Sequence, residues 1–159
     1  MIKIYFIFDK TKKSQILKKK ILRTYKNYSP SKSDYIVVAG GDGFMLNNLK
    51  KFNKYNKPFY GINCGTYGFL LNKYINNNLE KKILRAKKTL INPLEIISIN
   101  KKNYKKKLIA INEVSLFRQS KQTVSLKLNI GKKNIIKKLI GDGLLVSTPA
   151  GSTAYNLSV

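Results

Sequence analysis

The sequence contains no histidine and a single cysteine, Cys64. The absence of histidine excludes Ser–His–Asp catalysis, histidine-dependent zinc sites and histidine as a general base. A single cysteine excludes an internal disulfide and a thiolate metal cluster, and it favours a reduced, cytoplasmic setting. The apolar stretch at residues 2–8 is far too short to span a membrane, and no small-residue cleavage site follows it. We therefore expect neither a signal peptide nor a membrane partner.

Acidic residues are also scarce, with 7 Asp and Glu against 32 Lys and Arg, which gives a formal net charge of +25 at pH 7. Proteins that read nucleic acids usually use arginine for bidentate contacts, and this chain has only Arg23, Arg85 and Arg118. Its lysines are spread along the whole chain together with abundant Asn, Ile and Tyr. We interpret most of the charge as a solvated surface and expect no specific nucleic-acid partner. A nonspecific basic nucleic-acid-binding protein is the alternative from a different functional class.

The first part of the chain alternates between apolar runs and helical patterns. Runs at residues 2–8, 35–39 and 58–62 lack polar alternation, as buried parallel strands do. Apolar residues at helical spacing follow at residues 11–26, after Gly43, and at residues 76–88. This alternation predicts an α/β lobe with a parallel sheet over residues 1–90.

The pattern changes after residue 91. Short runs at residues 94–99, 108–111, 135–140 and 144–146 are typical of strands, and residues 124–130 alternate strictly between apolar and polar side chains. A hairpin turn is expected at residues 131–134. These features predict a mostly antiparallel β lobe over residues 91–159, incomplete at the carboxyl end because nothing further closes its sheet.

The loop Gly40-Gly41-Asp42-Gly43 lies between a predicted buried strand and a helix. Ligands of α/β sheets bind at the carboxyl ends of the strands, where glycines let the backbone approach a phosphate. A carboxylate there would repel an anion unless it holds a metal ion or accepts a proton from a hydroxyl group. The competing interpretation is a turn that simply needs glycine, with Asp42 as the helix N-cap.

Two more of the seven acidic residues stand in suggestive places. Asp142 lies between two glycines at the start of the stretch 141–158, which reads as a strand, a turn of small residues and the start of a helix near residue 154. Glu113 follows Asn112 after a predicted strand, and such a pair can hydrogen-bond an adenine edge or ribose hydroxyls. Taken alone, the stretch 141–158 is equally well explained as an ordinary strand–turn–helix connection, and the pair at 112–113 is better explained as a polar strand end.

Taken together, four segments of this chain resemble the NAD kinases: residues 40–43, 61–70, 112–113 and 141–158. The resemblance covers the whole chain and implies a Rossmann-like first lobe, a β-rich second lobe and transfer of the γ-phosphoryl group of ATP to the 2′-hydroxyl of NAD. It implies Mg²⁺ or another divalent cation with ATP, ATP or polyphosphate as donor, and a homo-oligomer. It also implies further residues beyond the carboxyl end of this chain. Another Gly-Gly-Asp-Gly kinase, acting on a lipid or a sugar phosphate, is the alternative, but the pair at 112–113 with the long final motif is not expected there.

The resemblance also implies roles for individual residues. Asp42 matches the catalytic base and, with Gly43, a dinucleotide contact, while Phe69 lines the adenine pocket. Asn112 and Glu113 match the pair that binds the dinucleotide. Asp142 matches an acidic residue that reaches NAD from a neighbouring subunit. The segment that holds adenine and ribose comprises Thr153, Ala154, Tyr155, Asn156, Leu157 and Ser158.

Overall fold

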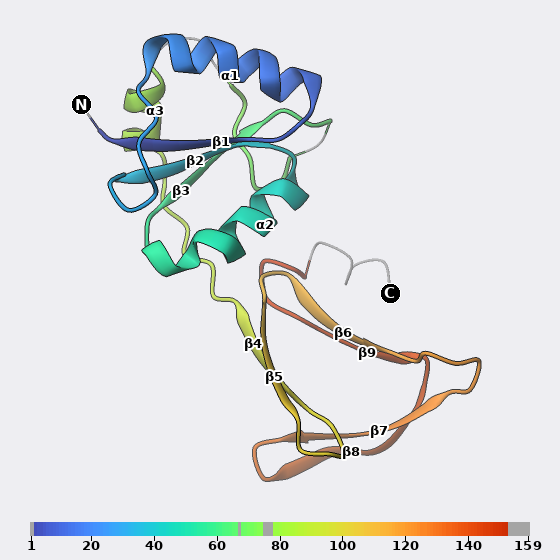
Figure 1. The fold of residues 1–159 in the computed structure, drawn as a ribbon. Coiled ribbons are helices and arrows are strands. Elements are labelled where there is room, and N and C mark those ends of the chain that lie inside the picture. Colours follow the sequence, from blue (N-terminus) through green and yellow to red (C-terminus); the bar gives the residue numbers. More distant parts are fainter. Residues whose placement is uncertain (1, 67, 75–77, 153–159) are drawn as a thin grey trace. The chain divides into compact units, whose positions relative to one another are not determined.

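The computed structural model describes residues 2–66, 68–74 and 78–152, and the chain divides into two compact units, Met1–Thr89 and Leu90–Val159 (Figure 1). The first unit holds the parallel sheet with its helices and the second holds antiparallel strand pairs, so the predicted fold class is confirmed. Within the described ranges, no helix is both long enough and apolar enough to cross a membrane.

The sheet of the first unit has the order β1-β2-β3, with all strands parallel. It consists of β1 (Ile4–Phe8), β2 (Tyr35–Gly40) and β3 (Phe59–Asn63). The central strand β2 is covered on both faces, since residues 36–39 have no exposed surface at all. This double coverage explains why the strand shows an unbroken apolar run rather than alternation.

Helices α1 (Lys12–Thr24), α2 (Asp42–Phe52) and α3 (Leu79–Arg85) flank this sheet, and a short 3₁₀ turn, η1 (Asn53–Tyr55), follows α2. α1 and α3 pack on one face, where Leu17 and Ile83 join Val37 in one apolar cluster. α2 covers the opposite face, where Met45 packs with Val38 (Figure 1). The sheet therefore presents the turn between β2 and α2 at its carboxyl edge.

The second unit contains three antiparallel pairs, β4-β5, β6-β9 and β7-β8. The strands are β4 (Leu94–Ile99), β5 (Lys105–Ala110), β6 (Glu113–Phe117), β7 (Val124–Ile130), β8 (Lys133–Gly141) and β9 (Gly143–Ser147). Many large apolar side chains of this unit are exposed, and among its described hydrophobic residues only Ala110 and Ile111 are buried.

One strand was missed, and two local expectations were wrong. The strand β6 was not predicted, because Glu113–Phe117 is short and starts at a polar pair. The expected four-residue turn at 131–134 contains only Gly131 and Lys132, since the left-handed φ of +56° at Gly131 allows the chain to reverse at once and β8 to begin at Lys133. The last helix of the first unit is shorter than expected and ends at Arg85, where Ala86 is extended.

Candidate functional site

The glycine-rich turn connects the end of β2 to the start of α2. A Cβ atom on Gly40 would lie 2.6 Å from the Phe44 ring and 2.9 Å from an Asp9 carboxylate oxygen, so a larger residue there would require these side chains to shift. Gly41 is the N-cap of α2, and its carbonyl accepts the first helical hydrogen bond, from the Met45 N–H at 3.0 Å. Among the described residues, nothing lies within 4 Å of an ideal Cβ on Gly41 or Gly43. The outer side of the turn is thus open to a ligand.

Asp42 is the first residue of α2, and both of its carboxylate oxygens are hydrogen-bonded. Oδ2 accepts from the Phe69 N–H at 2.9 Å, and Oδ1 accepts from the Leu70 N–H at 3.1 Å. Since Gly41 is the N-cap, the interpretation of Asp42 as a capping residue is wrong. Asp42 instead fastens a loop that lies 27 and 28 residues further along the chain. A carboxylate has about four lone-pair sites, so each oxygen can accept one further hydrogen bond.

The loop from Asn63 to Asn72 folds back along the edge of β3. Its ends are joined by the Asn63 N–H, which donates to the Asn72 carbonyl at 2.8 Å, and by the Asn72 N–H, which donates to the Gly61 carbonyl at 2.8 Å. Inside the loop, the Asn63 side chain accepts from the Gly65 N–H at 2.8 Å. A Cβ on Gly68 would lie 2.8 Å from the Asn63 side chain. The structure therefore joins two of the motifs, residues 40–43 and 61–70, into one assembly.

Phe69 belongs to this assembly, but its side chain is 92% exposed. Its backbone N–H donates a hydrogen bond to Asp42, which fixes the position of the main chain that carries the exposed ring. Its assignment to an adenine pocket remains a prediction.

A second assembly forms in the β unit around Asn112 and Glu113. The Asn112 carbonyl accepts from the Thr148 N–H at 2.7 Å, and the Thr148 hydroxyl donates to the Ile111 carbonyl at 2.7 Å. A Cβ on Gly151 would lie 2.1 Å from the Asn112 carbonyl oxygen, so only glycine fits against this strand. The predicted pair and the turn of the final motif are therefore brought together. Thr148 is 3% exposed and was not singled out in the sequence, although it directly precedes Pro149 in that motif.

One carboxylate oxygen of Glu113 is buried without a hydrogen-bond partner among the described residues. Glu113 starts β6 opposite Ser147, and the buried oxygen is its Oε2. A buried carboxylate oxygen is costly when unpaired, so such an atom in a native structure calls for a donor. The Oε1 atom of Glu80 is also buried without a partner in the described part of the chain, so the unpaired oxygen is consistent with a ligand hydroxyl or N–H group at Glu113 but does not by itself identify a site.

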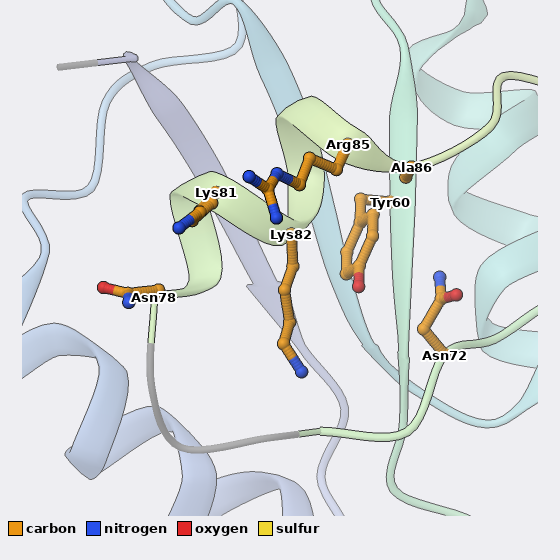
Figure 2. Close-up of a pocket in the computed structure, with 7 residues that line it drawn as sticks. All are labelled: Tyr60, Asn72, Asn78, Lys81, Lys82, Arg85 and Ala86. Atoms are coloured by element: carbon orange, nitrogen blue, oxygen red, sulfur yellow. The ribbon is translucent and has the colours of Figure 1, made fainter.

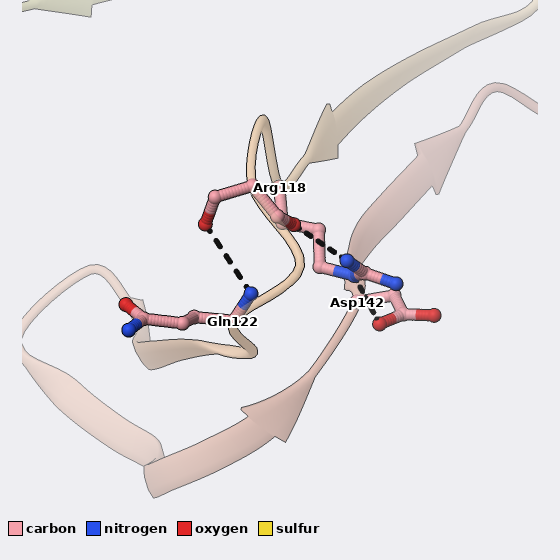
Figure 3. Close-up of polar contacts among 4 residues, drawn as sticks. Arg118, Gln122 and Asp142 are labelled. Atoms are coloured by element: carbon pink, nitrogen blue, oxygen red, sulfur yellow. Dashed lines mark hydrogen bonds and ion pairs between the residues drawn. The ribbon is translucent and has the colours of Figure 1, made fainter.

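Asp142 lies between β8 and β9, where its carboxylate forms an ion pair with Arg118, Nε to Oδ1 at 2.5 Å (Figure 3). Arg118 was not identified from the sequence as a site residue. It is one of only three arginines in the chain, and that rarity could have drawn attention to it. The predicted residues Thr153, Ala154, Tyr155, Asn156, Leu157 and Ser158, with the helix start expected there, lie outside the described residues. Within the described part, no three His, Cys, Asp or Glu side chains cluster as metal ligands do.

A separate open pocket of about 460 Å³ lies in the first unit, beside β3 and α3 (Figure 2). Burial raises the pKa of the Tyr60 phenol above its ordinary value. None of the predicted site residues lines this pocket, which is bordered by Tyr60, Asn72, Asn78, Lys81, Lys82, Arg85 and Ala86. It therefore adds nothing to the two assemblies described above.

A parallel sheet with a glycine-rich turn leading from its central strand into a helix is the arrangement in which α/β proteins bind nucleotides. Sequence models of the ATP-NAD kinase N-terminal domain and of the ATP-NAD kinase C-terminal domain match residues 5–87 and 111–159. The chain belongs to the NAD kinase family.

Curated relatives agree with this assignment. The chain is 41% identical to an NAD kinase of Brucella suis over 155 residues, and 42% identical to an NAD kinase of Rhizobium meliloti over 153 residues. These matches cover 98% and 96% of this chain, but the chain spans only 60% of the length of each relative.

Two solved structures share the fold. One is an NAD kinase from Archaeoglobus fulgidus in complex with ATP, with a TM-score of 0.72, 23% identity, and coverage of 99% of this chain and 65% of that one. The other is a yeast NADH kinase complexed with NADH, with a TM-score of 0.76, 21% identity, and coverage of 99% and 60%.

Proposed function

We propose that the protein is an NAD kinase, which transfers the γ-phosphoryl group of ATP to the 2′-hydroxyl of NAD and forms NADP. The observation that carries this proposal is the 41% identity to a curated NAD kinase along nearly the whole chain. The complexes of the two structural neighbours, one with ATP and one with NADH, agree with a nucleotide donor and a dinucleotide acceptor. The chain spans 60% of the length of this relative, so the activity of the whole protein is part of the proposal.

We assign the general-base role to Asp42. Phosphoryl transfer needs mainly positioning and charge stabilisation, together with a group that accepts the proton of the attacking hydroxyl. The two backbone N–H groups that bind Asp42 fix the orientation of its carboxylate, and a free lone pair on each oxygen remains for the ribose hydroxyl. The open side of Gly43 leaves room for the dinucleotide beside the carboxylate.

The remaining residues would bind the dinucleotide. Asn112 and Glu113 would hydrogen-bond it, and the buried Oε2 of Glu113, which has no partner among the described residues, supports this role. Phe69 would border the adenine, and the segment from Thr153 to Ser158 would hold adenine and ribose. Asp142 would reach the dinucleotide of a neighbouring subunit, which requires a homo-oligomer. Mixing an inactive Asp42 variant with an Asp142 variant of impaired activity should then restore part of the lost activity, whereas shared sites are refuted if no mixture regains any.

We expect the divalent cation to arrive with ATP. The described residues offer no acidic cluster for a resident metal ion, and Mg²⁺ is commonly held by substrate phosphates with only one or two carboxylates. When bound, the cation would neutralise charge on the phosphates. We place the enzyme in the cytoplasm, because its single cysteine is free and buried, as in proteins of reducing compartments.

The test is the formation of NADP from NAD and Mg²⁺–ATP, followed with an NADP-specific dehydrogenase. It is run with the chain 1–159 and with the same chain joined to the part of the Brucella suis relative that it does not span. A parallel reaction with polyphosphate in place of ATP identifies the donor. Activity in the joined protein supports the proposal, and its complete absence with both donors contradicts it.

A further inference from the structure

The backbone of Asp142 is held at one defined position. The Arg118 N–H donates to the Asp142 carbonyl at 2.9 Å, one step beyond the last pair of the β6-β9 ladder, Phe117 with Gly143. A Cβ on Gly143 would lie 2.0 Å from the Leu116 carbonyl oxygen, so the strands approach this closely only because residue 143 is glycine. Asp142 is therefore placed directly opposite Arg118.

The side chain of Arg118 is fixed by three further contacts. Its Nε donates to the Oδ1 of Asp142 at 2.5 Å (Figure 3), and its Nη1 donates to the Ser120 carbonyl. Its guanidinium carbon also lies 6.0 Å from the centre of the Phe117 ring. The planar fork of arginine reaches the carboxylate and the carbonyl from two different nitrogens in a fixed geometry, whereas lysine carries its three N–H groups on a single nitrogen. The contacts therefore depend on arginine as such and not only on its positive charge.

The two partners differ in exposure. The Arg118 side chain is 28% exposed, whereas that of Asp142 is 60% exposed, and Oδ2 of Asp142 has no hydrogen-bond partner in the described part of the chain. Oδ1 of Asp142 is thus held by Arg118, and Oδ2 is available to accept a hydrogen bond from a ligand. An exposed ion pair adds little to stability, so stability alone is a weak explanation for this arrangement.

We propose that Arg118 is a positioning residue that holds the Asp142 carboxylate by Oδ1 so that Oδ2 accepts a hydrogen bond from the dinucleotide. The inference rests on the proposed function, in which Asp142 binds NAD. Arg118 also offsets the negative charge of Asp142, which would otherwise repel the pyrophosphate of the ligand. The guanidinium acts through Asp142 and does not touch the dinucleotide itself.

The experiment compares Arg118→Gln, Arg118→Lys, Asp142→Asn and the double variant Arg118→Gln/Asp142→Asn in the joined protein described above. We expect Arg118→Gln to raise the KM for NAD by about fivefold, the effect of about 1 kcal/mol, with kcat and the KM for ATP within about twofold of the parent. Arg118→Lys should recover part of the loss. In the Asp142→Asn background, Arg118→Gln should not change the KM for NAD further, because the carboxylate through which Arg118 acts is absent.

The matched control is Arg23→Gln, which removes the same charge from the last turn of α1. An Arg118→Gln protein that behaves like this control refutes the role of Arg118 while NADP formation by the parent still supports the kinase function. Fully additive effects in the double variant also refute the inference, because Arg118 would then act on the ligand directly. A parent that forms no NADP refutes the kinase function itself. If Arg118→Gln fails to fold, Arg118→Lys in both backgrounds supplies the same comparison.

Discussion

Replacing Asp42 with asparagine separates two roles of this carboxylate. Asparagine keeps one oxygen, which can still accept from the Phe69 or the Leu70 N–H, but its amide nitrogen then faces the other N–H as a second donor. One charged hydrogen bond is therefore lost. Both contacts are at least partly exposed, so water can replace the lost partner, and we expect a stability loss of about 1 kcal/mol.

The expected loss of activity is much larger. If Asp42 only fastened the loop 63–72, a 1 kcal/mol change would reduce kcat by about fivefold. If it is also the general base, kcat should fall by about 10²- to 10⁴-fold, while the KM for NAD changes little because asparagine still hydrogen-bonds hydroxyls. The assay measures kcat, both KM values and the unfolding temperature on the same protein.

The control is Asn63→Ala, which removes the acceptor of the Gly65 N–H and loosens the same loop without touching the carboxylate. We expect it to reduce kcat by no more than about fivefold, the effect of one hydrogen bond of about 1 kcal/mol. An Asp42→Asn protein whose kcat is no lower than that of Asn63→Ala would refute the general-base role. Asp42 would then be a residue that organises the loop.

Three further predictions follow from single contacts. Glu113→Gln should leave the unfolding temperature level or raise it, because the unpaired buried oxygen no longer carries charge, while the KM for NAD rises; calorimetry and kinetics check both. Thr148→Val removes the hydroxyl that bonds the Ile111 carbonyl and the Gly151 N–H, and should cost about 1–3 kcal/mol in denaturant unfolding. Burial raises the pKa of the Cys64 thiol, so it should react with iodoacetamide at pH 7.5 far more slowly than the unfolded chain does, and equal rates would contradict its burial.

Much of the first unit could be predicted because its elements are local. The unbroken apolar run at Ile36–Ala39 indicated a central strand covered on both faces, and the spacing of Met45, Leu49 and Phe52 indicated the helix that covers one of them. The glycine-rich turn between them was located correctly.

The contacts of Asp42 could not be predicted in the same way. They join residues 27 and 28 positions apart, and nothing in the motif at 40–43 specifies which backbone N–H groups will reach the carboxylate. The pair Arg118 and Asp142 was missed for a similar reason. β6 pairs with β9, although the hairpin β7-β8 lies between them in the sequence. The partner of Asp142 therefore depends on β6, a strand that the sequence of residues 113–117 does not clearly predict. Patterns of side chains predict elements, while such non-local pairing is decided by packing.

The most direct test of the proposed kinase function is a competition among acceptors. The joined protein is incubated with Mg²⁺ and ATP labelled on its γ-phosphate, in the presence of NAD, a diacylglycerol and fructose 6-phosphate together, and the labelled products are separated and identified by mass spectrometry. The account predicts label in NADP, on the 2′-position of the adenosine ribose, and none in the lipid or the sugar. Label in the lipid or the sugar phosphate with none in NADP would contradict it.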